Sequence, residues 1–180
     1  MKSVLISIKP KWCELIASGK KTIEVRKTRP KCDTPFKCYI YCTLSELLTR
    51  SHYNGEIYVA TSKKHQKALE RNGNTTLSGK VIGEFVCKNM TCIQADIDFQ
   101  GEKHLYNTAF IENRMCLNDE ELFNYIYEGK RNEGYGWHIS DLVVYDKPKS
   151  IKEFYHYGVR RGAKVTRPPQ SWCYCEELKE

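Results

Sequence analysis

The stretch Gly19-Lys20-Lys21-Thr22-Ile23-Glu24-Val25-Arg26 decides the fold of this chain. From Thr22 to Lys27 polar and apolar residues alternate, which is the pattern of a half-buried β-strand. Thr22, Glu24 and Arg26 form the polar face of this strand. A carboxylate and a guanidinium are unusual groups on one short strand face. The pattern therefore indicates a functional segment.

The residues before this stretch predict a strand and a short helix. Ser3–Ile8 is a β-rich run that ends before Lys-Pro. Pro10 suits the first position of a helix, and apolar residues recur at i, i+3 and i+4 from Trp12. Gly19 suits the left-handed residue that ends a helix. We therefore expect a helix over residues 10–19 that packs on a sheet.

The rest of the chain predicts short strands interrupted by small helices. Asn118 is the expected N-cap of one helix, whose first turn holds three acids favoured by the helix dipole. The expected strands are Phe36–Thr43, Ile57–Thr61, Gly79–Val86 continued through Thr91–Phe99 after a bend at 88–89, Tyr135–Tyr145 and a closing strand at the end of the tail 167–175; the expected helices or helical turns are Leu44–Arg50, Ser62–Asn72, 117–128 and Ile151–Phe154. Because strands and helices do not alternate regularly, the pattern favours an α+β domain built on a curved sheet or small barrel.

The positive charge is concentrated near the N-terminus. The formal net charge is +7; residues 1–40 hold ten Lys or Arg against three acids, whereas residues 41–180 hold nineteen of each. Residues 147–170 form a second basic segment, and residues 91–128 are acidic. If the two basic segments converge on one face, that face would attract phosphates. A solvated basic surface is the alternative.

Length, cysteines and hydropathy limit the class of protein. The 180 residues fit one domain. Nine cysteines, an odd number without an export signal, favour buried reduced thiols over a disulfide framework. No apolar run reaches the roughly 20 residues of a spanning helix. We expect a cytoplasmic protein with no membrane association, no metal and no cofactor.

The opening stretch resembles the signature of the ASCH family, within the PUA-like superfamily, which reads Gly-x-Lys-x-x-Glu-x-Arg. Gly19, Lys21, Glu24 and Arg26 occupy its fixed positions. The segments 79–85 and 137–142 and the strand and helix before the motif fit the same resemblance. The ending Pro169-Gln170-Ser171-Trp172-Cys173-Tyr174 resembles a subgroup often carried by bacteriophages and prophages. The resemblance covers most of the chain, so we expect a single domain of residues 1–180 in which 44–78 and 100–130 are insertions.

The resemblance implies a PUA-like small β-barrel flanked by short helices, with a cleft beside the first helix, that binds RNA or a nucleotide. Arg26 offers a planar fork of donors, Lys21 a point charge for phosphate, and Glu24 an acceptor. Strict alternation turns Lys21 away from Glu24, so the turn at Gly19 must govern its direction. An ordinary ion pair between Glu24 and Arg26 is the alternative reading. The expected nucleic-acid-binding residues are Lys9, Trp12, Lys20, Lys21, Glu24, Arg26, Trp137, Gln170, Ser171 and Trp172, with the tryptophans available for base stacking.

An enzyme is the first alternative function. One branch of the family hydrolyses N4-acetylcytidine with a Lys, a Thr and a Glu, and Lys21 matches its Lys. Glu24 stands where that branch has its Thr, so Thr22 is the substitute nucleophile that we consider. The resulting hypothesis is an amidohydrolase or nuclease that acts on a modified nucleoside or RNA with Lys21, Thr22 and Glu24 as catalytic residues. His138 is expected to be a core or rim residue rather than a base.

A protein-interaction module is the second alternative. The expected insertion at 44–78 and the acidic stretch at 91–128 are the surfaces that such a partner would use. The partner would be a transcription or translation factor whose activity the protein modulates.

Overall fold

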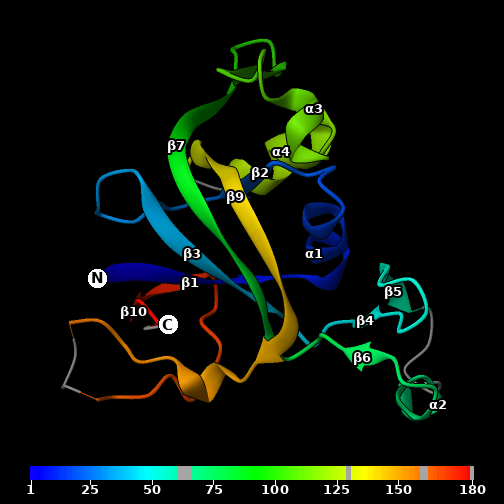
Figure 1. Ribbon diagram of the computed structural model, residues 1–180. Helices are drawn as coiled ribbons and strands as arrows, with labels where there is room; N and C mark the ends of the chain where they lie inside the picture. The colour runs from blue at the N-terminus through cyan, green and yellow to red at the C-terminus, as the bar shows by residue number, and fades with distance from the viewer. Residues whose placement is uncertain (61–65, 129–130, 159–161, 179–180) are drawn as a thin grey trace.

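The computed structural model describes residues 1–60, 66–128, 131–158 and 162–178, which form a mixed α+β fold with short helices (Figure 1). The strands are β1 (Lys2–Ile8), β2 (Ile23–Arg26), β3 (Phe36–Cys42), β4 (Leu47–Arg50), β5 (Ile57–Ala60), β6 (Thr75–Thr76), β7 (Val81–Ile97), β8 (Lys103–Tyr106), β9 (Glu133–Lys149) and β10 (Trp172–Glu176). The helices are α1 (Pro10–Ala17), α2 (Gln66–Arg71), α3 (Glu112–Met115), α4 (Asp119–Ile126) and the 3₁₀ turn η2 (Ile151–Glu153). No helix in these ranges is long and apolar enough to cross a membrane.

The main sheet has the strand order β10-β1-β3-β7-β9-β2, and β8 pairs with β7. β1 and β3 are parallel, so the chain between them must cross over, and this crossover contains α1 and β2. β2 pairs with β9 at the far end of the sheet from β10. In the described part of the chain β2 and β10 do not pair with each other, so the expected closed barrel is not confirmed.

The sheet is nevertheless strongly curved. The guanidinium Nη2 of Arg26, on β2, donates to the backbone carbonyl of Ser7, on β1, at 2.6 Å. These two strands are separated by β3, β7 and β9 in the order of the sheet. A direct bond between them requires the sheet to curl, and the cavity described below lies in the space that this curl encloses.

Two long strands, β7 and β9, pair with each other in this sheet (Figure 1). Their pairing shifts register at three places, one of them between Cys87 and Met90, which agrees with the bend expected at 88–89. Another shift adjoins Gly83, where an added Cβ would lie 2.4 Å from the carbonyl oxygen of Val143. Such β-bulges bend a strand and increase its twist.

Three groups of buried side chains hold these elements together. One joins α1 to the sheet through residues such as Cys13, Ile16 and Trp137. A second packs α3 and α4 on β2 and β7. The third lies on the other side of β1 and β3 and includes residues of η2 and β10. Trp137 has no exposed surface, so the expectation that it stacks on a base does not fit its position in the core.

Several elements expected from the sequence are confirmed. The first helix is α1, and Gly19 follows it with φ of 74°. The helix expected at 117–128 is α4, and Asn118 caps it in a capping box with Glu121. Residues 61–65 of the expected Ile57–Thr61 strand and Ser62–Asn72 helix lie outside the described residues.

The helical turn expected at Leu44–Arg50 is wrong. Residues 47–50 form β4, the middle strand of a small sheet with the order β5-β4-β6. Leu48 and Leu77 are fully buried in the same core group as α1. The segment 44–78 therefore contributes more to the core than an appended insertion would. Its strand pairing is non-local, and local residue spacing cannot reveal it.

Candidate functional site

A cavity of about 530 Å³ lies beside α1 and β2. Three of its charged lining residues, Lys21, Glu24 and Arg26, belong to the opening stretch. Trp12 of α1 and Tyr125 of α4 supply aromatic side chains. The remaining lining residues are Ser7, Lys9, Val25, Tyr41, Thr43, Leu44, Ser45, Leu117, Glu121, Pro168, Pro169 and Gln170. The cavity therefore draws on five separate segments of the chain.

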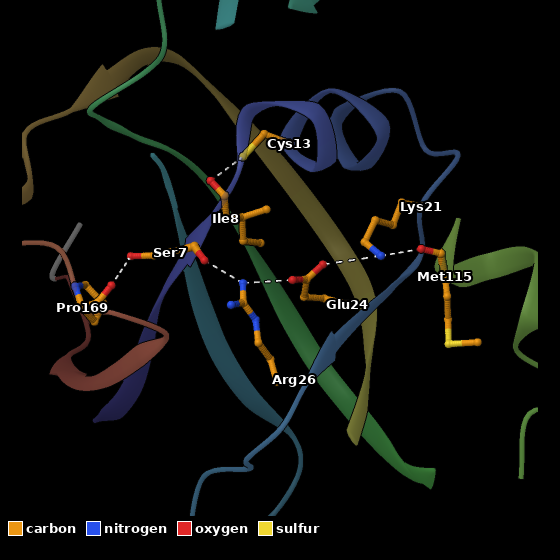
Figure 2. Close-up of polar contacts among 8 residues, drawn as sticks. All are labelled: Ser7, Ile8, Cys13, Lys21, Glu24, Arg26, Met115 and Pro169. Carbon is orange, nitrogen blue, oxygen red and sulfur yellow. Dashed lines mark hydrogen bonds and ion pairs between the residues drawn. The ribbon is translucent and has the colours of Figure 1, made fainter. Parts of the chain in front are cut away.

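The three charged residues form a continuous row at this cavity (Figure 2). Glu24 Oε1 lies 2.9 Å from Arg26 Nη2, and Glu24 Oε2 lies 3.5 Å from Lys21 Nζ. The exposed fraction of the side chain is 2% for Lys21, 6% for Glu24 and 11% for Arg26. Two cations and one carboxylate are thus buried together, which leaves one positive charge without a partner inside the row.

Backbone carbonyls hold both ends of this row (Figure 2). Lys21 Nζ donates to the carbonyl of Met115, at the end of α3, and Arg26 donates to the carbonyl of Ser7. The hydroxyl of Ser7 donates in turn to the carbonyl of Pro169 at 2.6 Å. A chain of polar contacts therefore connects the segment before β10 with the α3 region and passes along the cavity.

Two buried polar atoms in this row have no hydrogen-bond partner. These are Glu24 Oε2, which makes only the longer ion-pair contact with Lys21, and Arg26 Nε. Buried polar atoms are almost always paired, so each exception needs an explanation. A donor and an acceptor left open beside a cavity are the arrangement expected where a ligand supplies the missing partners.

Burial lowers the pKa of Lys21 below its usual 10.5, and the carboxylate of Glu24 partly opposes this effect. The cause is the loss of water around the ammonium, which penalises its charged form. An anion placed in the cavity would favour the charged form again. A bound anion and the charged form of Lys21 would therefore stabilise each other.

The direction of Lys21 follows from the turn before the strand. β2 begins at Ile23, so Lys21 precedes the alternation that would have turned it away from Glu24. Its backbone N–H donates to the carbonyl of Leu15 at 2.9 Å, which ties it to α1. The expected half-buried character of the strand is not observed, because Glu24 is only 5% exposed. Residues that line the cavity, rather than water, cover the polar face of β2.

Thr22 lies away from the cavity lining. Its hydroxyl accepts a hydrogen bond from Arg114 Nε at 3.0 Å, and its backbone N–H donates to the carbonyl of the same residue. This hydroxyl is engaged on the α3 side of β2. The hypothesis that Lys21 activates Thr22 as a nucleophile gains no support from this placement.

The other residues expected to bind nucleic acid divide into two groups. Lys9, Trp12 and Gln170 line the cavity, whereas Lys20, Trp137, Ser171 and Trp172 do not. Lys20 is exposed. The carbonyl of Ser171 accepts from the backbone N–H of Ser7 at 2.9 Å, and Trp172 Nε1 donates to Thr28 Oγ1 at 3.0 Å. These two residues position neighbouring segments and do not reach the cavity.

α4 also contributes to the cavity, which the expected binding residues did not include. Glu121 and Tyr125 line the cavity, while Leu122, Phe123 and Ile126 face the core. Residues four apart share one helix face, so the pair could have been recognised as the face opposite to the apolar stripe. Its position over β2, however, depends on non-local packing that the sequence does not state.

One group of potential metal ligands lies elsewhere, near the β7–β8 hairpin. Ligand atoms of Asp98, Glu102 and His104 come within 4.8 Å of one another. His104 Nε2 and Asp98 Oδ2, 3.0 Å apart, form an ion pair when the histidine is charged. This contact explains the cluster without an ion.

All nine cysteines are free thiols, and burial raises the pKa of several, including Cys13 and Cys38.

Comparisons with known proteins agree with this description. Residues 6–70 match the family model of the ASCH domain. The crystal structure of ASCH from Zymomonas mobilis superposes with a TM-score of 0.57 over 97% of this chain and 88% of that chain, at 17% identity. Two mutant structures of the Zymomonas mobilis protein give TM-scores of 0.58 at 17% and 16% identity, covering 98% and 97% of this chain and 92% and 89% of theirs.

No curated protein matches the chain. The bacteriophage subgroup expected from the C-terminal segment is not supported by these matches. The likeness to the solved structures extends over nearly the whole chain, beyond the segment that the family model covers. Residues 6–70 are therefore similar to the ASCH domain, and the chain has the fold of solved ASCH proteins.

Proposed function

We propose that the cavity beside α1 and β2 binds one nucleotide unit, either free or as part of an RNA strand. The observation that carries this proposal is the buried row of Lys21, Glu24 and Arg26, which holds one more positive than negative charge. An excess buried charge is costly unless a counter-charge meets it. A phosphate or another anionic group of a nucleotide would supply that counter-charge.

The open polar atoms support a nucleotide over a simple anion. Arg26 Nε can donate to a phosphate or to an acceptor on a base edge, while Glu24 can accept from an amino or hydroxyl group. An inorganic anion offers no donor to Glu24 unless it is protonated. A nucleotide offers both kinds of group.

The aromatic residues of the cavity provide surfaces for a base. Trp12 is partly exposed, and Lys21 Nζ lies 4.9 Å from the centre of its ring system. Tyr125 stands on α4 and is 37% exposed. Stacking on an aromatic side chain is worth ~1–3 kcal/mol per base. Either ring would add affinity for a base without selecting its identity.

Calorimetric titration with nucleoside monophosphates and short single-stranded RNA tests the proposal. Wild type should bind, Arg26→Gln should weaken binding by about tenfold or more, consistent with loss of a hydrogen bond to a charged group, and Lys20→Gln should bind like wild type. Lys20 is the matched control because it is exposed and adjacent to Lys21 but does not line the cavity. Equal loss in both variants, or binding by neither wild type nor variants, would contradict the proposal.

A hydrolase that acts on a modified nucleoside or RNA is the second candidate function. The lowered pKa of the buried Lys21 favours it, since groups with perturbed pKa values concentrate at catalytic sites. In this version Lys21 and Glu24 would be the reacting groups, because Thr22 is engaged by Arg114. Mass spectrometry of nucleosides and oligonucleotides incubated with wild type and with Lys21→Gln distinguishes the two functions. A new product made by wild type alone would identify an enzyme, whereas retained ligand without turnover supports binding.

A further inference from the structure

A second cavity, of about 540 Å³, is formed by residues 27–33, the loop after β2, together with Tyr135 of β9. Three of its lining residues, Lys27, Arg29 and Lys31, are basic, and Asp33 is acidic. The ligand of this cavity should therefore carry negative charge. This loop lies within the first 40 residues, which carry the positive charge of the sequence.

The second cavity adjoins the first on two sides. Arg26 lines the first cavity, and the next residue, Lys27, lines the second. Lys27 Nζ lies 5.3 Å from the ring centre of Tyr125, which also lines the first cavity. On the other side Trp172 Nε1 donates to Thr28 Oγ1, and Trp172 stands two residues after a lining residue of the first cavity. A chain-like ligand could pass from one cavity to the other along the end of β2.

Contacts with β1 and β10 hold the loop in place. The backbone N–H of Lys31 donates to the hydroxyl of Tyr174 at 2.6 Å, and Lys2 Nζ donates to the carbonyl of Lys31 at 3.5 Å. Together with the hydrogen bond from Trp172 to Thr28, these contacts hold both the first and the second half of the loop. A loop that is already ordered loses less entropy when a ligand binds.

Two of the three cations are available to a ligand. Lys27 forms an ion pair with Glu128. Arg29 and Lys31 form no ion pair with any carboxylate in the described ranges. The guanidinium carbon of Arg29 lies 5.7 Å from the ring centre of Tyr135. Arginine planes and aromatic rings are the surfaces on which unstacked bases lie in complexes with single-stranded RNA.

We propose that the second cavity is a subsite for the neighbouring nucleotide of a single-stranded nucleic acid whose other nucleotide occupies the first cavity. Arg29 and Lys31 contact the phosphate that joins the two nucleotides, and Tyr135 with Arg29 supports the second base. This inference rests on the function proposed above. It adds that the natural ligand is a strand of at least two nucleotides and not a free nucleoside.

Titration with RNA of one, two and four nucleotides tests the subsite. Wild type should bind the dinucleotide and tetranucleotide more tightly than the mononucleotide. The double variant Arg29→Gln, Lys31→Gln should lose about tenfold in affinity for the longer ligands, and its salt slope should fall by about 0.7, the value for one phosphate no longer neutralised on a single strand. The matched control is Lys147→Gln, Lys152→Gln, two exposed lysines at or beyond the opposite end of β9 from Tyr135.

Variants of Tyr135 separate stacking from charge. Tyr135→Phe keeps the ring and should bind the dinucleotide like wild type, whereas Tyr135→Leu should bind it less tightly and keep the salt slope. Thermal unfolding of each variant, measured beside wild type, identifies any loss of fold. If Tyr135→Leu is unstable, the comparison of the double variant with its lysine control still decides the result.

The outcomes distinguish the subsite from the first cavity. If mononucleotide binding depends on Arg26 but longer strands bind no more tightly, the subsite is wrong and the proposed function stands. An increase with length that survives the Arg29, Lys31 double variant also overturns the subsite. If no nucleotide or strand binds wild type, both proposals fall together.

Discussion

Glu24 is the residue on which the charged row depends, because it is the one carboxylate between two buried cations. Its two oxygens contact Arg26 at 2.9 Å and Lys21 at 3.5 Å. Surface ion pairs contribute little to stability, but removing one partner of a buried pair leaves a charge without compensation. The three residues should therefore differ in their effect on folding although they belong to one network.

We expect Glu24→Gln to destabilise the protein more than Lys21→Met. The first change leaves two cations buried side by side and should cost ~3–5 kcal/mol. The second leaves the Glu24–Arg26 pair balanced and removes the bond to the carbonyl of Met115, which should cost ~1–3 kcal/mol. Urea unfolding of both variants checks the order. Equal losses would show that the row is not electrostatically coupled.

The affinity for an anionic ligand should fall in alkaline solution through Lys21. Burial lowers the pKa of this lysine from 10.5, so its positive charge is lost at a lower pH than that of an exposed lysine. Titration of wild type should show that affinity falls as pH rises through the lowered pKa. The affinity of Lys21→Gln should lack this pH dependence. An unchanged pH profile in Lys21→Gln would assign the effect to another group.

The same lowered pKa has the opposite effect on the stability of the ligand-free protein. Between the folded pKa of Lys21 and 10.5 the unfolded chain binds more protons than the folded one, so the contribution of this group to the free energy of unfolding increases with pH. The two measurements together separate loss of ligand contacts from loss of fold.

At the scale of single residues the sequence predicted that Lys21, Glu24 and Arg26 act together, but not the geometry of the cavity that they line. The spacing of Lys21, Glu24 and Arg26 marked the segment. Nothing local could show that Thr22 turns to Arg114, since that contact joins residues 92 positions apart. The unpaired Arg26 Nε is likewise a property of packing, not of sequence.

The α4 helix is the element through which folding and the site are connected. Glu121 accepts from the backbone N–H of Asn118 in the capping box and also lines the cavity. Tyr125 lies one turn later on the same face. The cap therefore positions the side of the helix that meets the ligand.

Asn118→Ala should lower the free energy of unfolding by ~1 kcal/mol, because the side chain caps the N–H of Glu121. It should also weaken ligand binding, since the helix face that lines the cavity is less well held. Asn118→Asp retains a capping oxygen and is the matched control. Chemical unfolding and titration of both variants give the comparison, and an Asn118→Ala protein as stable as wild type would contradict the role of the cap.

Most elements could be predicted from periodicity, and the failures share one cause. α1 has a proline at its start and Gly19 after its end, α4 has a capping box, and both have apolar stripes, so both can be predicted from the sequence. β4 replaces the expected helical turn, because Leu47 and Leu48 fit either a helical or a strand period in a short run. Its identity comes from pairing with β5 and β6, which lie further along the chain. Pairing partners, not local preference, also determine whether the sheet closes.

At the scale of the whole molecule the excess charge lies where the two cavities are. The first 40 residues carry the full formal charge of +7, and they supply Lys9, Lys21 and Arg26 to the first cavity and residues 27–33 to the second. The second basic segment, 147–170, reaches the first cavity through Pro168, Pro169 and Gln170, which are uncharged. Among the described residues of this segment, those that line the cavity carry no charge, so the two basic segments meet there by position and not by charge.

This arrangement predicts a preference for single-stranded over double-stranded nucleic acid. The cavity of about 530 Å³ has the size of a small-molecule pocket, so a base must leave its stack to enter it. Unstacking and unpairing cost a few kcal/mol in a duplex and much less in a flexible single strand. We expect a single strand to bind at least tenfold more tightly than a duplex of the same sequence at the same salt concentration.

Arg26→Gln provides the decisive comparison for this preference. If base insertion causes the preference, the variant should lose most of its affinity for the single strand and little of its weak, salt-dependent affinity for the duplex, because the latter depends on surface charge. Lys20→Gln, with the same change in net charge, should keep the preference. Equal affinity of wild type for single strand and duplex would mean that the basic surface alone attracts nucleic acid and that the cavity receives no base.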